Sequence, residues 1–377
     1  MSERGKRTAG GARALPGRYY TSSAIFAREM EQLFASRWLC AGRQSELDQR
    51  GSISLFELAP ERPGPEPVPR ESVVIVRGDD DEIRAFHNVC RHRGARLCTI
   101  GGHTQGRIRC PYHAWSYGLD GRLLGAPNMT DVADFDRADY PLLPVATAVW
   151  EGFVFVNLSV APVPFADAFA PIHDAFAPWG ISRLVTAERV TYEVAANWKL
   201  LFQNYAECYH CPIIHPALNQ LTPYLGAEND LQRGEILGGP MQIRQSDASM
   251  TTSGHLCGPP LVDGVERQRV YYYTILPGMF LSLHPDYVLV HRIQPLAIDR
   301  TRVICEWLFD PSYAQVEGSD PQEAVTFWDR VNREDWHVCE LAQLGVVSRG
   351  YVPGPYSELE SVTAAFDRAY LEALDER

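Results

Sequence analysis

The chain has 377 residues, of which 45% are hydrophobic and 22% are charged, an ordinary composition for a globular protein with more than one core. Its net charge of −12 argues against nucleic-acid binding, because neutralising phosphates requires an excess of Lys and Arg. No apolar run reaches the length of a membrane span, and residues 1–18 lack the apolar segment of a secretory signal. We therefore expect a cytoplasmic protein without membrane association, whose nine cysteines do not form a disulfide framework.

The first half of the chain is rich in short strand-like runs. A helical periodicity over residues 19–40 precedes them. The clearest predicted strands are rich in β-branched and aromatic residues, and they span 53–58, 73–76, 83–86 and 153–156. The proline-rich stretch 60–69 is expected to be a loop, because proline cannot join a central strand.

The second half mixes helices and strands. A helical pattern over 197–209 is expected to end at Pro212. Predicted strands follow at 270–276, 287–293 and 302–309, and a long helix is predicted over 321–344. The chain contains no GxGxxG motif, so any NAD(P)H chemistry is expected to take place on another protein.

Two loops each supply one cysteine and one histidine. Cys90-Arg-His92 is followed, after seventeen residues, by Cys110-Pro-Tyr-His113. Zinc fingers usually place two cysteines together and two histidines together. A Rieske [2Fe–2S] cluster has two cysteines on one iron and two histidines on the other, so each loop can give one ligand to each iron. The pattern therefore favours a [2Fe–2S] cluster over a zinc site.

A second candidate metal site follows the predicted helix. On a helix, Glu207 and His210 lie one turn apart on one face, and a chain that turns at Pro212 can bring His215 beside His210. Two imidazoles and one carboxylate make the facial triad of non-haem Fe(II) enzymes. Taken alone, two histidines five residues apart fit a structural pair equally well.

These motifs together resemble one family. Cys90-Arg-His-Arg-Gly94 with Cys110-Pro-Tyr-His-Ala-Trp-Ser-Tyr-Gly118 is similar to the Rieske domain of ring-hydroxylating and related oxygenases. The segment Glu207-x2-His210-x4-His215 resembles the D/E-x2-H-x4-H motif of the same family. Respiratory Rieske proteins have a disulfide across the cluster, but here Tyr112 stands in the corresponding place and leaves Cys98 without a partner. The resemblance is therefore to the oxygenase branch.

The resemblance implies an α+β fold with two domains. A β-sandwich Rieske domain is expected over 45–160, and a helix-grip (START-like) catalytic domain with a curved antiparallel sheet over 161–377. The N-terminal arm and helix, 1–44, are expected to pack with the catalytic domain.

The same resemblance implies the ligands of two cofactors in each subunit. A [2Fe–2S] cluster is assigned to Cys90, His92, Cys110 and His113, and a mononuclear Fe(II) to His210, His215 and Asp335. Asp335 is nominated because residues 334–343 resemble the family segment E-D-x3-C-E-x2-Q. The alternatives are that Asp335 is a solvated charge, or that Asp329 is the ligand. His337 is expected to be structural or exposed.

The family also implies roles in electron transfer. The carboxylate Glu207 is expected to bridge His113 of one subunit and His210 of the next, with Asn204 near it. The family usually has Asp at this position and often has the Asn four residues earlier, so the path is expected to differ slightly here. A homotrimer is implied, with O2, a small-molecule substrate and a separate NAD(P)H-dependent flavin or iron–sulfur reductase as partners, and a ferredoxin as a further candidate donor.

The segment Asn204-Tyr-Ala-Glu-Cys-Tyr-His-Cys-Pro212 is similar to the corresponding segment of the quaternary-ammonium branch of the family, which acts on glycine betaine, choline or carnitine. Such a substrate is bound by a cage of aromatic faces. The candidates are Tyr271, Tyr273, Phe280, Tyr287 and Trp307, although each is also suited to a core position. The alternative is an aromatic ring-hydroxylating dioxygenase or O-demethylase. A pure electron-transfer Rieske protein is disfavoured by the complete second metal motif.

Overall fold

A computed structural model of the chain describes residues 11–58 and 70–375. These residues fall into two compact units, one formed by 34–58 and 70–165 and the other by 11–33 and 166–375. The proline-rich loop predicted at 60–69 lies outside the described residues. The domain limits expected at 44/45 and 160/161 remain a proposal. Within the described part of the chain, no helix is long and apolar enough to cross a membrane.

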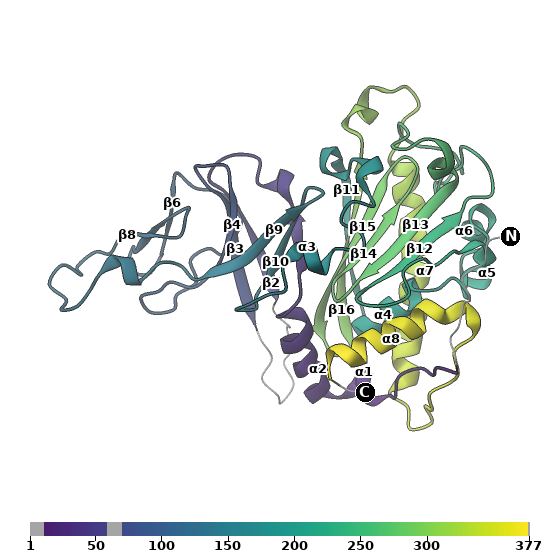
Figure 1. Ribbon diagram of the computed structural model, residues 1–377, viewed down its shortest axis with the longest axis horizontal. Helices are drawn as coiled ribbons and strands as arrows, with labels where there is room; N and C mark the ends of the chain where they lie inside the picture. Colours follow the sequence, from purple (N-terminus) through teal and green to yellow (C-terminus); the bar gives the residue numbers. More distant parts are fainter. Residues whose placement is uncertain (1–10, 59–69, 376–377) are drawn as a thin grey trace. The chain divides into compact units, whose positions relative to one another are not determined.

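The unit formed by residues 34–165 is built from antiparallel strands (Figure 1). A seven-stranded sheet has the order β1-β10-β9-β4-β3-β2-β5. Its strands are β1 (Leu39–Arg43), β2 (Ser52–Leu58), β3 (Glu71–Arg77), β4 (Ile83–His87), β5 (Gly102–His103), β9 (Pro144–Trp150) and β10 (Phe153–Asn157). A three-stranded sheet contains β6 (Arg107–Arg109), β7 (Ser116–Gly118) and β8 (Leu123–Gly125). A single buried apolar cluster includes residues of both sheets together with Cys90 and Cys110.

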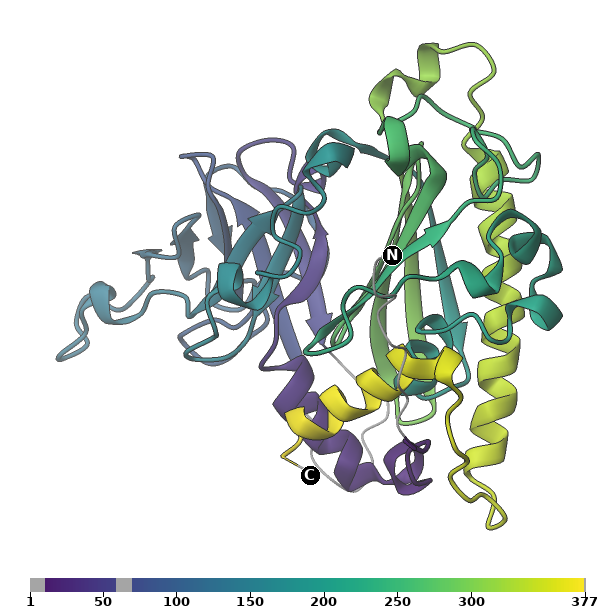
Figure 2. The same ribbon diagram turned by 45° about the vertical axis from the view of Figure 1, so that its right-hand side comes forward.

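The other unit is built on a six-stranded antiparallel sheet of order β11-β16-β15-β14-β13-β12. The strands are β11 (Val185–Val194), β12 (Ile236–Gln242), β13 (Arg269–Ile275), β14 (Met279–Leu283), β15 (Val288–Ala297) and β16 (Arg300–Phe309). Helix α7 (Gln322–Val346) runs along this sheet, as Figure 2 shows. The expected α+β class with a curved antiparallel sheet and a long helix is confirmed.

Shorter helices complete this unit. They are α1 (Arg18–Thr21), α2 (Ser23–Glu29), α4 (Trp198–Tyr205), α5 (Cys211–Ile214), α6 (Pro216–Leu221) and α8 (Ser361–Ala373). A buried ion pair joins two of them, with Lys199 Nζ on α4 2.6 Å from Glu29 Oε1 on α2. Trp198 and Tyr370 also donate hydrogen bonds to Glu29, so the buried carboxylate is fully partnered.

Two predicted helices are shorter than expected. The helical pattern of 19–40 ends at a π-helical turn, Met30–Phe34, because the next segment pairs with β10 as strand β1. The helix predicted over 197–209 ends at Tyr205. Glu207 accepts hydrogen bonds from the backbone N–H groups of Tyr209 and His210, which replaces the helical bonding pattern by a turn. Glu207 and His210 therefore do not lie on a helix.

A buried acid on α8 links this unit's stability to pH. Asp367 accepts hydrogen bonds from Gln203 (2.6 Å) and Tyr356 (2.7 Å). Burial raises the pKa of Asp367 to about 7, against the opposing effect of these bonds. Since the folded pKa lies above the unfolded value, its stabilising contribution is complete below about pH 4 and is lost as the pH rises through about 7.

We expect Asp367→Asn to flatten the pH dependence of stability. The wild-type unfolding midpoint should fall relative to that of the variant between pH 4 and pH 8, as measured by differential scanning calorimetry. Asp263→Asn, the same change at an exposed position, serves as the control and should track the wild type. Parallel curves for wild type and Asp367→Asn would contradict the prediction.

Candidate metal centres

The two loops with the predicted cluster ligands have the same backbone design. In each, the cysteine N–H donates to the carbonyl five residues on, at Ala95 and Trp115. The residue four positions on donates back to the cysteine carbonyl and has positive φ, +71° at Gly94 and +59° at Ala114. Glycine adopts this conformation freely, whereas alanine there is strained and must be held by the loop. The two loops therefore share one backbone turn, with the histidine two residues after the cysteine in the first loop and three residues after it in the second.

The four side chains separate into a thiol pair and an imidazole pair. Cys90 and Cys110 are buried side by side in the apolar cluster. The rings of His92 and His113 lie 4.9 Å apart, and His113 is exposed. This arrangement fits a [2Fe–2S] cluster in which both cysteines bind one iron and both histidines bind the other.

Two further residues at this site were missed by the sequence reasoning. Tyr117 Oη lies 3.3 Å from Cys90 Sγ and accepts the N–H of Arg91, which leaves its proton for the sulfur. Trp115 stacks flat on His92 at 4.7 Å. Hydrogen bonds to ligand sulfurs tune the potential of such clusters, so Tyr117 is placed to tune this one. Both residues lie in the Trp-Ser-Tyr segment soon after Cys110, and this position in the motif could have identified them as neighbours of the cluster.

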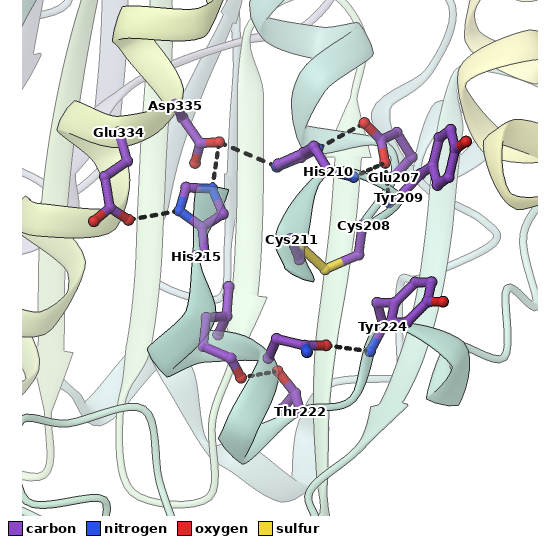
Figure 3. The surroundings of a disulfide bond; sticks show 12 residues. Glu207, Cys208, Tyr209, His210, Cys211, His215, Thr222, Tyr224, Glu334 and Asp335 are labelled. Carbon is purple, nitrogen blue, oxygen red and sulfur yellow. Dashed lines mark hydrogen bonds and ion pairs between the residues drawn. A yellow bond between two sulfur atoms is a disulfide. The ribbon is translucent and has the colours of Figure 1, made fainter. Parts of the chain in front are cut away.

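The predicted iron ligands meet between a loop and a long helix (Figure 3). His210 and His215 lie on the loop and α5 segment that follows α4, and Asp335 comes from α7. The Asp335 Oδ1 atom lies 2.8 Å from His215 Nε2 and 3.3 Å from His210 Nε2. Among the described residues, these three side chains each place a ligand atom within 4.8 Å of the others, which is close enough to hold a single metal ion.

The charges at this site favour a cation at its centre. Burial lowers the pKa of His210, but hydrogen bonds to Asp335 and Glu207 outweigh it and raise that pKa to about 10. Burial raises the pKa of Asp335, yet the two histidines bring it down to about 2. The carboxylates that raise the pKa of both histidines would also stabilise a metal cation held between the two Nε2 atoms. The donor set of two imidazoles and one carboxylate is that of non-haem Fe(II) sites, so the residues fit the ion.

The later residues of the family segment 334–343 on α7 form hydrogen bonds to the backbone just before α4. Glu340 accepts the N–H of Ala195 (3.0 Å), and Gln343 accepts the N–H of Asn197 (2.9 Å). The predicted alternative ligand, Asp329, instead accepts a hydrogen bond from Tyr192 (2.7 Å), away from the site. His337 is exposed, as expected. The segment therefore fixes the helix that leads into the histidine loop.

A disulfide closes the loop around His210. Cys208 and Cys211 are bonded to each other. The composition argued against a disulfide framework, and it gave no reason to expect this single short-range bond. Its effect is local, because it joins residues on either side of a predicted iron ligand.

A cavity beside these residues is lined by aromatic side chains from α4, the turn between α4 and α5, α7, the sheet and the segment after α6. The aromatic lining residues are Tyr205, Tyr209, Tyr224, Tyr272 and Trp328, and Asn204 and Glu207 also line the cavity. None of the five predicted cage residues is among them, so that prediction was wrong.

The error lies in the choice of sheet face. Tyr271 and Tyr273 pack against Trp179 and Phe176, while Tyr272 points toward Trp328 and the cavity. Strand alternation separates these two sets, but it does not say which of them faces the helix. Phe280, Tyr287 and Trp307 are fully buried core residues.

A domain with paired Cys/His loops, together with a separate two-histidine, one-carboxylate site, defines a Rieske non-haem iron oxygenase. Comparison with family models agrees. Residues 37–136 match the Rieske [2Fe-2S] domain, and residues 181–376 match the ring hydroxylating alpha subunit (catalytic domain). The chain belongs to this family of Rieske oxygenases.

Characterised relatives cover most of the chain. It is 32% identical to the glycine betaine monooxygenase oxygenase subunit of Chromohalobacter salexigens, over 92% of this chain and 82% of that protein. It is 38% identical to the carnitine monooxygenase oxygenase subunit of Acinetobacter pittii, over 89% of this chain and 86% of that protein. A solved quaternary ammonium Rieske monooxygenase matches with a TM-score of 0.81 and 26% identity, over 99% of this chain and 98% of that one.

Membership of the family establishes the cofactors and the reaction type. The enzyme uses a Rieske [2Fe–2S] cluster and a mononuclear iron in each subunit, and it oxidises a small-molecule substrate with O2 and electrons from a separate donor.

We expect Cys90→Ser to abolish the cluster, because serine cannot supply the thiolate ligand. The visible absorption and the EPR signal of the reduced cluster should be lost. Cys98→Ser, which changes a free thiol of the same unit, should leave both unchanged. Spectra unaltered by Cys90→Ser would rule out the ligand assignment.

We expect Asp335→Ala to remove one iron atom per subunit and leave the cluster spectrum intact. The measurement is iron analysis alongside visible spectroscopy. Asp329→Ala, on the same helix, is the control and should retain all iron. Loss of the mononuclear iron in the Asp329 variant, with retention in the Asp335 variant, would reverse the assignment.

Proposed function

We propose that this enzyme is a monooxygenase that hydroxylates or N-demethylates a quaternary ammonium compound such as glycine betaine. The observation that carries the proposal is an aromatic cavity next to His210, His215 and Asp335. Glycine betaine and carnitine monooxygenase subunits are among its relatives, at 32% and 38% identity.

The charge of the cavity supports a cationic substrate. Of the described residues that line it, none is Lys or Arg, whereas Glu207 and Asp335 are both present. The rings of Tyr272 and Trp328 lie 6.3 Å apart in a T-shaped arrangement, and Tyr205 lies 6.1 Å from Tyr272. Aromatic faces attract a cation that has no N–H donors, and desolvation strengthens the attraction. Trp328 is held in place because its Nε1 donates to Tyr287 Oη at 2.7 Å.

We assign distinct roles to the residues around the iron. His210, His215 and Asp335 are proposed to hold it, and the iron, when bound, activates O2 for insertion into the substrate. The aromatic side chains are proposed to place one N-methyl or N-methylene group toward the proposed metal site. Asn204 borders the same cavity and is proposed to contribute to the electron path beside Glu207.

The proposed electron path crosses between subunits of a homotrimer, from the cluster through His113 to Glu207 and His210 of the next chain. Glu207 Oε1 accepts from His210 Nδ1 at 2.6 Å, which supplies the last link. Residues 88–125 contain six Arg and one Asp, a net charge of +5 in a chain of −12. Such a basic segment around the cluster favours docking on an acidic surface. A cytoplasmic NAD(P)H-dependent flavin or iron–sulfur reductase, or a ferredoxin, is proposed to load the cluster.

The ring-hydroxylating alternative rests on the shared fold. Naphthalene 1,2-dioxygenase matches with a TM-score of 0.71 at 17% identity, which shows the fold alone. No observation on the cavity favours an aromatic or anionic substrate over a cation.

The substrate class is tested by EPR of the nitric oxide adduct of the Fe(II) protein. We expect glycine betaine, choline or carnitine to perturb the nitrosyl signal and simple aromatic acids to leave it unchanged. Trp328→Leu should weaken binding of the cation that perturbs the signal about 3- to 30-fold, because one cation–π contact is lost. A signal perturbed by the aromatic acids alone would favour the ring-hydroxylating alternative.

We expect Glu207→Gln to retain both metals and to lower product formation about 10- to 100-fold, because only the link between the cofactors is weakened. The cluster is photoreduced, O2 and substrate are added, and product from a single turnover is measured. Glu358→Gln, the same change at an exposed position, should behave as wild type. Full single-turnover yield in Glu207→Gln would remove this residue from the path.

A further inference from the structure

We propose that Glu334 is a positioning residue for the mononuclear iron, which fixes the ring of His215 and ties the histidine loop to α7. Glu334 Oε2 lies 2.7 Å from His215 Nδ1. Figure 3 shows Glu334 and Asp335 each directed at a different nitrogen of this ring. The proposal concerns the protein scaffold around the metal and does not depend on which substrate is used.

The two histidines of the site are bonded in the same way. His210 donates from Nδ1 to Glu207, and His215 donates from Nδ1 to Glu334. In both rings the other nitrogen, Nε2, points to Asp335 Oδ1. A carboxylate on Nδ1–H holds the proton on that nitrogen, so the Nε2 lone pair is available to a metal. Glu334 therefore does for His215 what Glu207 does for His210.

The two carboxylates differ in their origin along the chain. Glu207 is three residues from its histidine, whereas Glu334 is 119 residues from His215. The bond from Glu334 is therefore a long-range connection between the loop and α7. Asp335 is the next residue on that helix, so the two acids together hold the His215 ring at both nitrogens.

The environment of this contact makes it effective. The His215 side chain is 1% exposed and cannot exchange Glu334 for water without opening the site, while Glu334 is 33% exposed. A buried imidazole N–H without an acceptor is unfavourable, so loss of the carboxylate frees the ring to rotate or change tautomer. The other partner of Glu334, Arg330, is 4.0 Å away on the exposed side of the helix and contributes little.

The test measures metal binding separately from activity. Protein freed of mononuclear iron is titrated with Fe(II) under anaerobic conditions, for wild type, Glu334→Ala, Glu334→Gln and Arg330→Gln. We expect Glu334→Ala to bind Fe(II) 10- to 100-fold more weakly, as for other residues that orient a metal-bound histidine. Glu334→Gln retains an acceptor oxygen for Nδ1–H and should recover most of the affinity. Arg330→Gln should lie within about twofold of wild type.

A spectroscopic readout separates positioning from general structural damage. The nitrosyl EPR signal of iron-loaded Glu334→Ala should broaden or change in rhombicity, while the visible spectrum of the [2Fe–2S] cluster stays unchanged. Rescue of the nitrosyl signal by Glu334→Gln completes the support. Wild-type Fe(II) affinity and an unaltered nitrosyl signal in Glu334→Ala would overturn the proposal.

Discussion

The contact on which the catalytic unit depends is the meeting of two imidazole Nε2 atoms at a single carboxylate oxygen, Asp335 Oδ1. A loop and a helix that are 120 residues apart in sequence must be held to within hydrogen-bond distance for this to occur. Much of the surrounding structure serves that end. Glu340 and Gln343 fix the entry to α4, and a disulfide closes the loop after it.

Burying several charged groups together is unfavourable unless each has a partner. At the two-histidine site each carboxylate is paired with an imidazole. The carboxylates of Glu207, Glu334 and Asp335 all contact imidazole nitrogens. Together they carry one more negative charge than Fe(II) neutralises, which creates a local potential that suits a cationic substrate in the neighbouring cavity. The same carboxylates therefore connect the fit of the metal to the choice of substrate.

Most of the metal ligands could be predicted from the sequence because they are closely spaced along the chain. The residues of the cavity wall could not be predicted in this way. The cluster ligands and the histidine pair lie within short segments, and the spacing within such a segment limits how its side chains meet. Asp335 needed the family resemblance, because nothing local relates it to His215. The tyrosines of β13 show the limit clearly. Alternation separates Tyr272 from its neighbours, but only the position of α7 decides which face borders the cavity. The end of α4 was misjudged because Glu207 bonds to the turn after it.

The disulfide between Cys208 and Cys211 has a consequence for handling the enzyme. Fe(II) must be kept from oxidising, and thiol reagents are a common choice for that purpose. A thiolate also attacks disulfides by exchange, so the same reagent opens the ring that encloses His210. Ascorbate is not a thiol and does not undergo this exchange, whereas dithiothreitol does. Preparations that contain identical amounts of iron can therefore differ in the chemistry of the loop that holds it.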